Sequence, residues 1–188
     1  ETDAALTAIA KGANVLVTGR AGVGKSAFLH ALHARLLEER DAERVLWAPS
    51  GTTKHVLVEL ARQLHAGGGL IVAESRLPPR NLARAKRLGY LPWADVSRTM
   101  RRLPIPEAQD VIADSLRGRT YLVMIDSLEV PPSQAALFAD MLSNAQAVAG
   151  MDDDNRRNRI DRLLWRFSER IELKPLPLGK CETIIERW

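Results

Sequence analysis

The chain has a single cysteine, Cys181, and few aromatic side chains, which make up 5% of its 188 residues. One cysteine excludes a framework of disulfides within the chain and any metal site that needs several cysteines. The longest apolar runs, such as residues 121–125, are far too short to cross a bilayer as a helix. No signal or transit peptide is recognisable, so we expect a reducing, cytoplasmic compartment.

The overall composition is that of one globular domain. Hydrophobic residues make up 46% and charged residues 27%, which excludes wholesale disorder, and the length allows a sizeable core. The sequence begins at Glu1, without an initiator methionine, and stops at Trp188 within a segment that has a helical pattern. We therefore expect a piece of a longer protein.

The formal net charge of +4 arises in one segment. Residues 74–102 contain eight basic residues against two acidic ones, so the remainder of the chain is slightly acidic. Arg80, Arg84 and Arg87 fall on one face of a predicted helix, and Tyr90 and Trp93 lie nearby for stacking on bases. Such a cluster could neutralise nucleic-acid phosphates, or it could pair with acidic groups of a protein or be a solvated surface.

Short apolar runs alternate with helical patterns along the chain, which predicts an α/β fold with a mostly parallel, five-stranded sheet flanked by helices. Four of the five strand segments are nearly continuous apolar runs, as expected when helices cover both faces of a sheet. Residues 70–104 are rich in proline, and we expect one or two short helices on loops there. Strands are predicted at 14–18, 44–48, 120–125, 146–151 and 169–173, and helices at 2–11, 25–40, 52–65, 107–117, 133–143, 159–168 and 180–187.

Residues 19–26, with the sequence GRAGVGKS, match the phosphate-loop pattern G-x-x-x-x-G-K-[ST] at every fixed position. The motif follows a predicted strand and opens a predicted helix, where free N–H groups and the helix dipole favour an anion. Lys25 is expected to reach the β- and γ-phosphates and to act in catalysis, and Ser26 to offer its hydroxyl to Mg²⁺. The predicted nucleotide-binding residues are Gly19, Arg20, Ala21, Gly22, Val23, Gly24, Lys25, Ser26 and Ala27.

An aspartate, Asp126, ends the apolar strand at 120–125, and we interpret it as the second Mg²⁺ ligand beside Ser26. The alternative is an aspartate that caps the following turn. Many ATPases of this kind have a second acid directly after this aspartate, but here that position is Ser127. Glu129 is the next acid and the candidate catalytic base; it could equally be a solvated loop residue. We therefore expect slow hydrolysis, which suits a switch better than a motor.

With these motifs, the chain resembles the AAA+/STAND group of P-loop ATPases along nearly its whole length. The phosphate loop indicates P-loop NTPases at large. The segments Arg162-Leu-Leu-Trp-Arg-Phe167 and Arg170-Ile-Glu-Leu-Lys-Pro-Leu176 are similar to the end of AAA+/STAND modules. The resemblance implies an ATPase core over residues 1–178, with a basic insertion at about 70–104. It also implies that residues 179–188 begin a helical lid that is largely missing.

The resemblance also implies roles for individual residues. A sensor 1 residue should follow the strand at 146–151, where any of the residues from Asp152 to Asn155 could fill the role. An arginine finger, which acts on a neighbouring subunit, should lie just before the last strand, where Arg166 matches best and Arg170 next. Each could instead be a surface arginine on a basic helix. A finger of this kind implies a homo-oligomer.

The leading hypothesis is therefore an ATP- and Mg²⁺-dependent switch or assembly ATPase that belongs to a larger protein. One alternative is a nucleic-acid-handling ATPase module that uses the basic insertion. Another is a signalling scaffold that binds nucleotide without turnover, and a nucleotide kinase is the least favoured reading. The four histidines lie on predicted helices, and we interpret them as surface or half-buried side chains rather than metal ligands.

Overall fold

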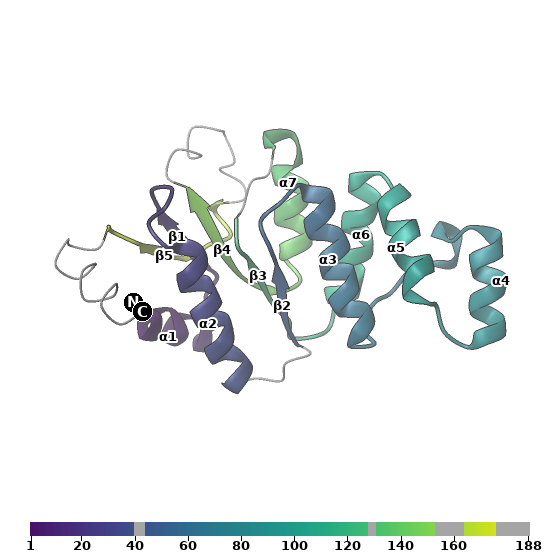
Figure 1. Cartoon of the computed structure of the whole chain (residues 1–188), viewed down its shortest axis with the longest axis horizontal. Helices are drawn as coiled ribbons and strands as arrows, with labels where there is room; N and C mark the ends of the chain where they lie inside the picture. Colours follow the sequence, from purple (N-terminus) through teal and green to yellow (C-terminus); the bar gives the residue numbers. More distant parts are fainter. Residues whose placement is uncertain (40–43, 128–130, 153–163, 176–188) are drawn as a thin grey trace, which may run out of the picture.

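A computed structural model describes residues 1–39, 44–127, 131–152 and 164–175. Its strands form one sheet of five, in the order β2-β3-β4-β1-β5, and each neighbouring pair is parallel (Figure 1). The strands span β1 Val15–Gly19, β2 Val45–Ala48, β3 Leu122–Ile125, β4 Gln146–Asp152 and β5 Glu169–Glu172. The α/β fold and the parallel five-stranded sheet predicted from the sequence are therefore confirmed.

Helices connect the strands, and several begin where the sequence favours a helix start. Thr52 caps α3, because its hydroxyl accepts a 3.3 Å hydrogen bond from the His55 amide. A proline stands in the first turn of α4, α6 and α7, where its missing N–H costs no helical hydrogen bond. The helices span α1 Thr2–Ala10, α2 Lys25–Glu39, α3 Thr53–Ala66, α4 Pro79–Leu88, α5 Trp93–Arg102, α6 Ile105–Leu116 and α7 Pro132–Leu142.

Both faces of the sheet are covered, and β3 illustrates how its side chains divide between them. Leu122 and Met124 join a core cluster with α1 and α2, whereas Val123 and Ile125 join a larger cluster with α3, α5, α6 and α7. Alternation along a strand sends successive side chains to opposite faces, so a strand buried on both faces must be apolar throughout. Figure 1 shows α2 and α3 on the two sides of the sheet.

The proline-rich stretch at 70–104 is more ordered than the expectation of short helices on loops. It contains a 3-10 turn at Glu74–Arg76 and two α-helices of ten residues each, α4 and α5. The α5 helix packs on α3, and its Val96 and Met100 are fully buried in the larger core cluster. α4 instead lies at the end of the molecule farthest from the sheet (Figure 1). The α5 part of this segment therefore belongs to the domain core.

Several predicted features lie outside the described residues. These are the body of the helix at 159–168, the helix at 180–187 and the lid at 179–188 with Cys181. The division into a core and a lid therefore stays a prediction. Within the described part of the chain, no helix is long and apolar enough to span a membrane.

Candidate nucleotide-binding site

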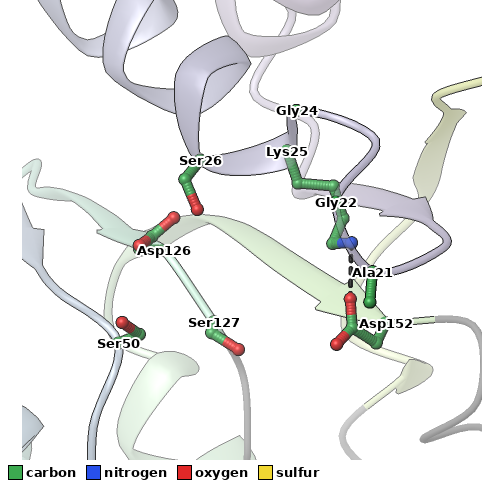
Figure 2. Close-up of a pocket in the computed structure, with 9 residues that line it drawn as sticks. All are labelled: Ala21, Gly22, Gly24, Lys25, Ser26, Ser50, Asp126, Ser127 and Asp152. Atoms are coloured by element: carbon green, nitrogen blue, oxygen red, sulfur yellow. Dashed lines mark ion pairs between the residues drawn. The ribbon is translucent and has the colours of Figure 1, made fainter. Parts of the chain in front are cut away.

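A cavity of about 400 Å³ opens at the carboxyl edge of the sheet, where the loops after β1, β2 and β3 meet the end of β4. Crevices at this edge of parallel sheets are the usual ligand sites of α/β folds. Figure 2 shows the side chains around the cavity. Its lining consists of Ala21, Gly22, Gly24, Lys25, Ser26, Ser50, Asp126, Ser127 and Asp152.

The phosphate loop adopts the strand–loop–helix arrangement that the sequence predicts, between β1 and α2. Gly22 and Gly24 have φ values of 78° and 97°, a left-handed conformation that favours glycine. α2 begins at Lys25 directly behind the loop, and its first amides have no partner within the helix. Of the nine predicted nucleotide-binding residues, five line the cavity and Gly19, Arg20, Val23 and Ala27 do not.

Two of these four residues support the loop instead. Gly19 ends β1 with no room for a side chain, because an added Cβ would lie 2.7 Å from the Leu173 carbonyl oxygen and 2.8 Å from Val23 Cγ1. Val23 is partly buried and packs against the core cluster of α1 and α2. The apolar residue at position 23 therefore anchors the loop on the domain.

Lys25 extends back over its own loop. Its ammonium group donates hydrogen bonds to the main-chain oxygens of Gly19, at 3.0 Å, and Arg20, at 2.8 Å. It also forms an ion pair with Asp152, with 2.5 Å between Nζ and Oδ1 (Figure 2). The side chain of Lys25 is only 11% exposed, so the ammonium group is held at the wall of the cavity.

Asp126 follows β3 directly, and its amide extends the ladder by donating a 2.9 Å hydrogen bond to the Ala48 carbonyl of β2. Its carboxylate and the Ser26 hydroxyl point toward one another (Figure 2). The Oδ1 atom is buried and has no hydrogen-bond partner among the described residues, and an unpaired buried oxygen is costly unless a ligand satisfies it. These hard oxygen donors fit Mg²⁺.

The position of Asp126 depends on Gly150 in the neighbouring strand β4. A Cβ added to Gly150 would overlap the main-chain oxygen of Asp126 and would lie 2.9 Å from Leu29 Cδ1 of α2. Residue 150 is therefore part of the site although it is not in the lining of this cavity and carries no functional group. The sequence gives a weak signal for it, a glycine inside an apolar strand pattern.

Sequence reasoning missed Ser50 and did not choose Asp152. Ser50 follows β2 at the same edge of the sheet as Asp126, which is the signal that could have found it. Asp152 was one of four candidates for the sensor 1 position, and the other three, 153–155, lie outside the described residues. β4 runs between β1 and β3, and this places Asp152 opposite Gly19 in the strand register.

The remaining predicted catalytic residues are not in the cavity lining. Glu129 lies outside the described residues. Arg166 is exposed in the turn before β5, and its carbonyl oxygen accepts a 2.7 Å hydrogen bond from the Asn14 amide group. Arg170 lies on β5, and its Nε donates a 3.2 Å hydrogen bond to the hydroxyl of buried Thr18 in the same chain. Of the two arginines, Arg166 is the one that faces solvent without a side-chain hydrogen bond to the domain's own strands.

Ion pairs divide the basic segment into two groups. Arg84 and Arg98 both contact Asp95, at 3.5 and 3.4 Å, and the Asp95 side chain is only 3% exposed. Arg76 and Lys86 also have acidic partners. Within the described part of the chain, no carboxylate pairs with Arg80, Arg87, Arg101 or Arg102.

The two aromatic residues of this segment differ as well. Tyr90 is 63% exposed, as stacking on a base would require. Trp93 is half-buried against the core, with its ring centroid 5.7 Å from that of His65. The expectation that Trp93 is available for stacking is therefore not supported by its position.

Two histidines of α2 pack on an aromatic ring. The rings of His30 and His33 lie 4.4 and 5.1 Å from Trp47 of the edge strand β2. Burial, and to a lesser degree the nearby His30, lower the pKa of His33 below its ordinary value. Gln63 pairs with both main-chain groups of Trp47, so it occupies the open edge of the sheet.

No known protein family and no curated protein matches this chain by sequence. Solved structures with a similar fold include ORC1 of Aeropyrum pernix in complex with DNA, with a TM-score of 0.56 and 16% identity over 99% of this chain. Pif1 helicase from Candida albicans gives a TM-score of 0.51 at 14% identity over 98%. Drosophila ORC bound to GC-rich DNA and Cdc6 gives 0.52 at 10% over 98%.

The chain spans 47%, 42% and 30% of these three structures, less than half the length of each. At these identities the likeness shows the fold alone, which is that of the P-loop NTPases. The phosphate loop found in the sequence lies between β1 and α2 of this fold and lines the cavity at the carboxyl edge of the sheet.

Proposed function

We propose that this chain is the ATP- and Mg²⁺-binding core of a P-loop ATPase of the AAA+/STAND type, which acts as a nucleotide-dependent switch or assembly module in a larger protein. The observation that carries the proposal is the cavity at the sheet edge. A glycine-rich loop, an ammonium group, a hydroxyl and an unpaired buried carboxylate oxygen converge there. This set of groups matches the phosphates and the metal ion of a nucleotide.

Each group has a defined task in this proposal. Lys25 and the amides at the start of α2 bind the phosphates, and Ser26 and Asp126 hold Mg²⁺. The bound Mg²⁺ would supply charge neutralisation and orient the β- and γ-phosphates. Ser127 occupies the position that follows the metal carboxylate, so the base that orients the attacking water must come from elsewhere, and Glu129 is the candidate. We expect slow turnover, because this base lies three residues beyond the metal ligand.

A homo-oligomer would complete the site through the exposed Arg166 of a neighbouring subunit. Trp165 beside it is 87% exposed, and tryptophan and arginine are enriched at the centres of protein interfaces. Arg170 is less suited to this role, because it bonds to Thr18 of its own chain.

Calorimetric titration with Mg-ATP tests the proposal. Lys25→Ala removes charge-assisted contacts of about 1.5–3 kcal/mol each, so the dissociation constant should rise at least about tenfold while the fold is retained. Lys11→Ala removes the same charge after the end of α1, before the amino end of β1 and thus at the edge of the sheet opposite the cavity, and serves as the matched control. A Lys25→Ala protein that binds Mg-ATP as tightly as the wild type would refute the phosphate-site assignment.

A second candidate function is nucleic-acid binding through α4 and α5. The observation that favours it is the set of four arginines that have no carboxylate partner among the described residues, with Tyr90 exposed between the two helices. Two of the solved structures with a similar fold contain DNA. Lysine and arginine side chains that neutralise phosphates release counterions, so this binding should depend strongly on salt.

The structure changes which arginines should be tested. Arg84 forms an ion pair with the buried Asp95, so replacing it would also remove a partner of a buried carboxylate. The sharper variant is Arg80→Gln with Arg87→Gln. Duplex-DNA affinity should fall at low salt, and the slope of log K against log salt should become shallower by about 0.9 for each lost phosphate contact.

A variant with Arg35→Gln and Arg117→Gln loses the same charge at two exposed sites elsewhere and should bind DNA like the wild type. ATP affinity should be unchanged in both variants. Absence of DNA binding by the wild type at low salt would exclude this function for the chain.

A further inference from the structure

All three hydrogen-bond donors of the Lys25 ammonium group are engaged by the protein itself. The partners are the carbonyls of Gly19 and Arg20 and the carboxylate of Asp152. An ammonium group has three N–H bonds, so a nucleotide phosphate must take the place of one existing partner or share it. The two carbonyls belong to the loop that binds the phosphates. The Asp152 carboxylate is therefore the partner that a phosphate would displace.

Asp152 is held in this position by the sheet. It is the last residue of β4 and lies opposite Gly19 in the register between β4 and β1. Its carboxylate extends toward Lys25 and Ala21 on the inner side of the cavity (Figure 2), and its side chain is 34% exposed. Within the described residues, Lys25 is the cation that pairs with it. The contact is short and charge-assisted, which makes it stronger than a neutral hydrogen bond.

We propose that Asp152 is an internal competitor for the phosphate-binding lysine and sets the affinity and the phosphate preference of the site. This inference rests on the proposed function, because it presumes that the cavity binds a nucleoside phosphate. A carboxylate resembles a phosphate in charge and in its oxygen acceptors. In the nucleotide-free chain Asp152 occupies the contact on Lys25 that a phosphate oxygen takes when nucleotide binds.

Two consequences follow for binding. Each nucleotide must break the contact between Lys25 and Asp152, which lowers the affinity for all of them. A bound nucleotide then lies beside an unpaired carboxylate, and like charges at close range repel. The γ-phosphate adds a further negative charge near Lys25, so Asp152 disfavours the triphosphate more than the diphosphate.

Asp152→Asn isolates the charge from the geometry. The amide oxygen can still accept a hydrogen bond from Lys25, and the two loop carbonyls keep the ammonium group over the cavity. We expect Mg-ATP to bind about tenfold more tightly, the effect of one charge-assisted contact, and Mg-ADP to gain less, about threefold. Asp152→Ser, which removes the charge and shortens the side chain, should change both affinities in the same direction.

The measurement is calorimetric titration of the whole chain with Mg-ATP and Mg-ADP, and circular dichroism reports on folding. Glu172→Gln is the matched control, because Glu172 ends β5 at the same edge of the sheet and does not line the cavity. It makes the same charge change and should leave both affinities within about twofold of the wild type, as expected for a screened charge.

The outcomes separate this inference from the proposed function. The inference is supported if Asp152→Asn binds nucleotide more tightly than the wild type and the gain in affinity is larger for Mg-ATP than for Mg-ADP. This also holds if the affinity of the wild type is too weak to measure. Unchanged or weaker nucleotide binding in Asp152→Asn overturns the inference about Asp152. If Lys25→Ala loses binding in the same experiment, the proposed function still stands. Equal gains in Asp152→Asn and Glu172→Gln overturn the inference as well, because the effect would then be general electrostatics. Absence of binding in every protein refutes both.

Discussion

Replacement of Gly150 by alanine is the most direct test of how the sheet positions Asp126, the proposed metal ligand. Residue 150 lies in the middle of β4 with no functional group of its own. An added methyl would overlap the Asp126 carbonyl oxygen and press on Leu29 Cδ1, at 2.9 Å. Leu29 is fully buried and Asp126 is bonded to β2, so neither neighbour has free space into which to move.

The expected cost follows from these contacts. Overpacking a well-packed core typically costs about 1–3 kcal/mol. Alanine recovers about 0.4–1 kcal/mol because it reduces the entropy of the unfolded chain. We therefore expect the free energy of unfolding to fall by about 1–2 kcal/mol, and Tm to fall by about 2–8 °C for a chain of this size. The displaced Asp126 should also weaken Mg²⁺-dependent nucleotide binding.

Urea unfolding and calorimetric titration with ATP, with and without Mg²⁺, measure the two effects. Gly67→Ala is the control, because Gly67 at the end of α3 has φ of −82°, which alanine adopts without strain. That variant should be at least as stable as the wild type and should bind Mg-ATP equally well. A Gly150→Ala protein with wild-type stability and an unchanged effect of Mg²⁺ would refute the packing argument.

Asp126→Asn should weaken ATP binding in the presence of Mg²⁺ and leave metal-free ATP binding nearly unchanged, because it removes one charged oxygen ligand. If Mg²⁺ changes the ATP affinity equally in the wild type and in Asp126→Asn, Asp126 is excluded from the metal site. Glu129→Gln should lower turnover with little change in affinity, since a base acts on the attacking water, and unchanged turnover would exclude that role. The lowered pKa of His33 means that the unfolded chain binds more protons near and below pH 6.5. The free energy of unfolding should therefore fall as the pH drops through that range, and His33→Gln should flatten the decline in urea titrations at several pH values.

The fold could be predicted from the sequence because its signals are local. The strand at 120–125 is a nearly continuous apolar run, the pattern expected of a strand that is covered on both faces. The phosphate loop could be found because its glycines and Lys25 lie within eight consecutive residues. Asp126 could be selected as a candidate for a similar reason, since it directly follows a strand, and it lies in the lining of the cavity. The helices α4 and α5 were underestimated, because closely spaced prolines obscured the periodicity of α5, which packs on α3.

Contacts between segments that are distant in the sequence required the tertiary structure. Lys25 and Asp152 are more than a hundred residues apart, and they meet because β4 pairs with β1 in the register that sets Asp152 against Gly19. Gly150 matters because a side chain there would overlap the main-chain oxygen of Asp126, which follows the adjacent strand. Arg84 matters because it forms an ion pair with the buried Asp95 on the next helix. A sequence pattern can predict which face of a helix or strand is buried, because the pattern is set by the residues of that same helix or strand. The partner of a residue depends on strand order and register, which many distant contacts decide together.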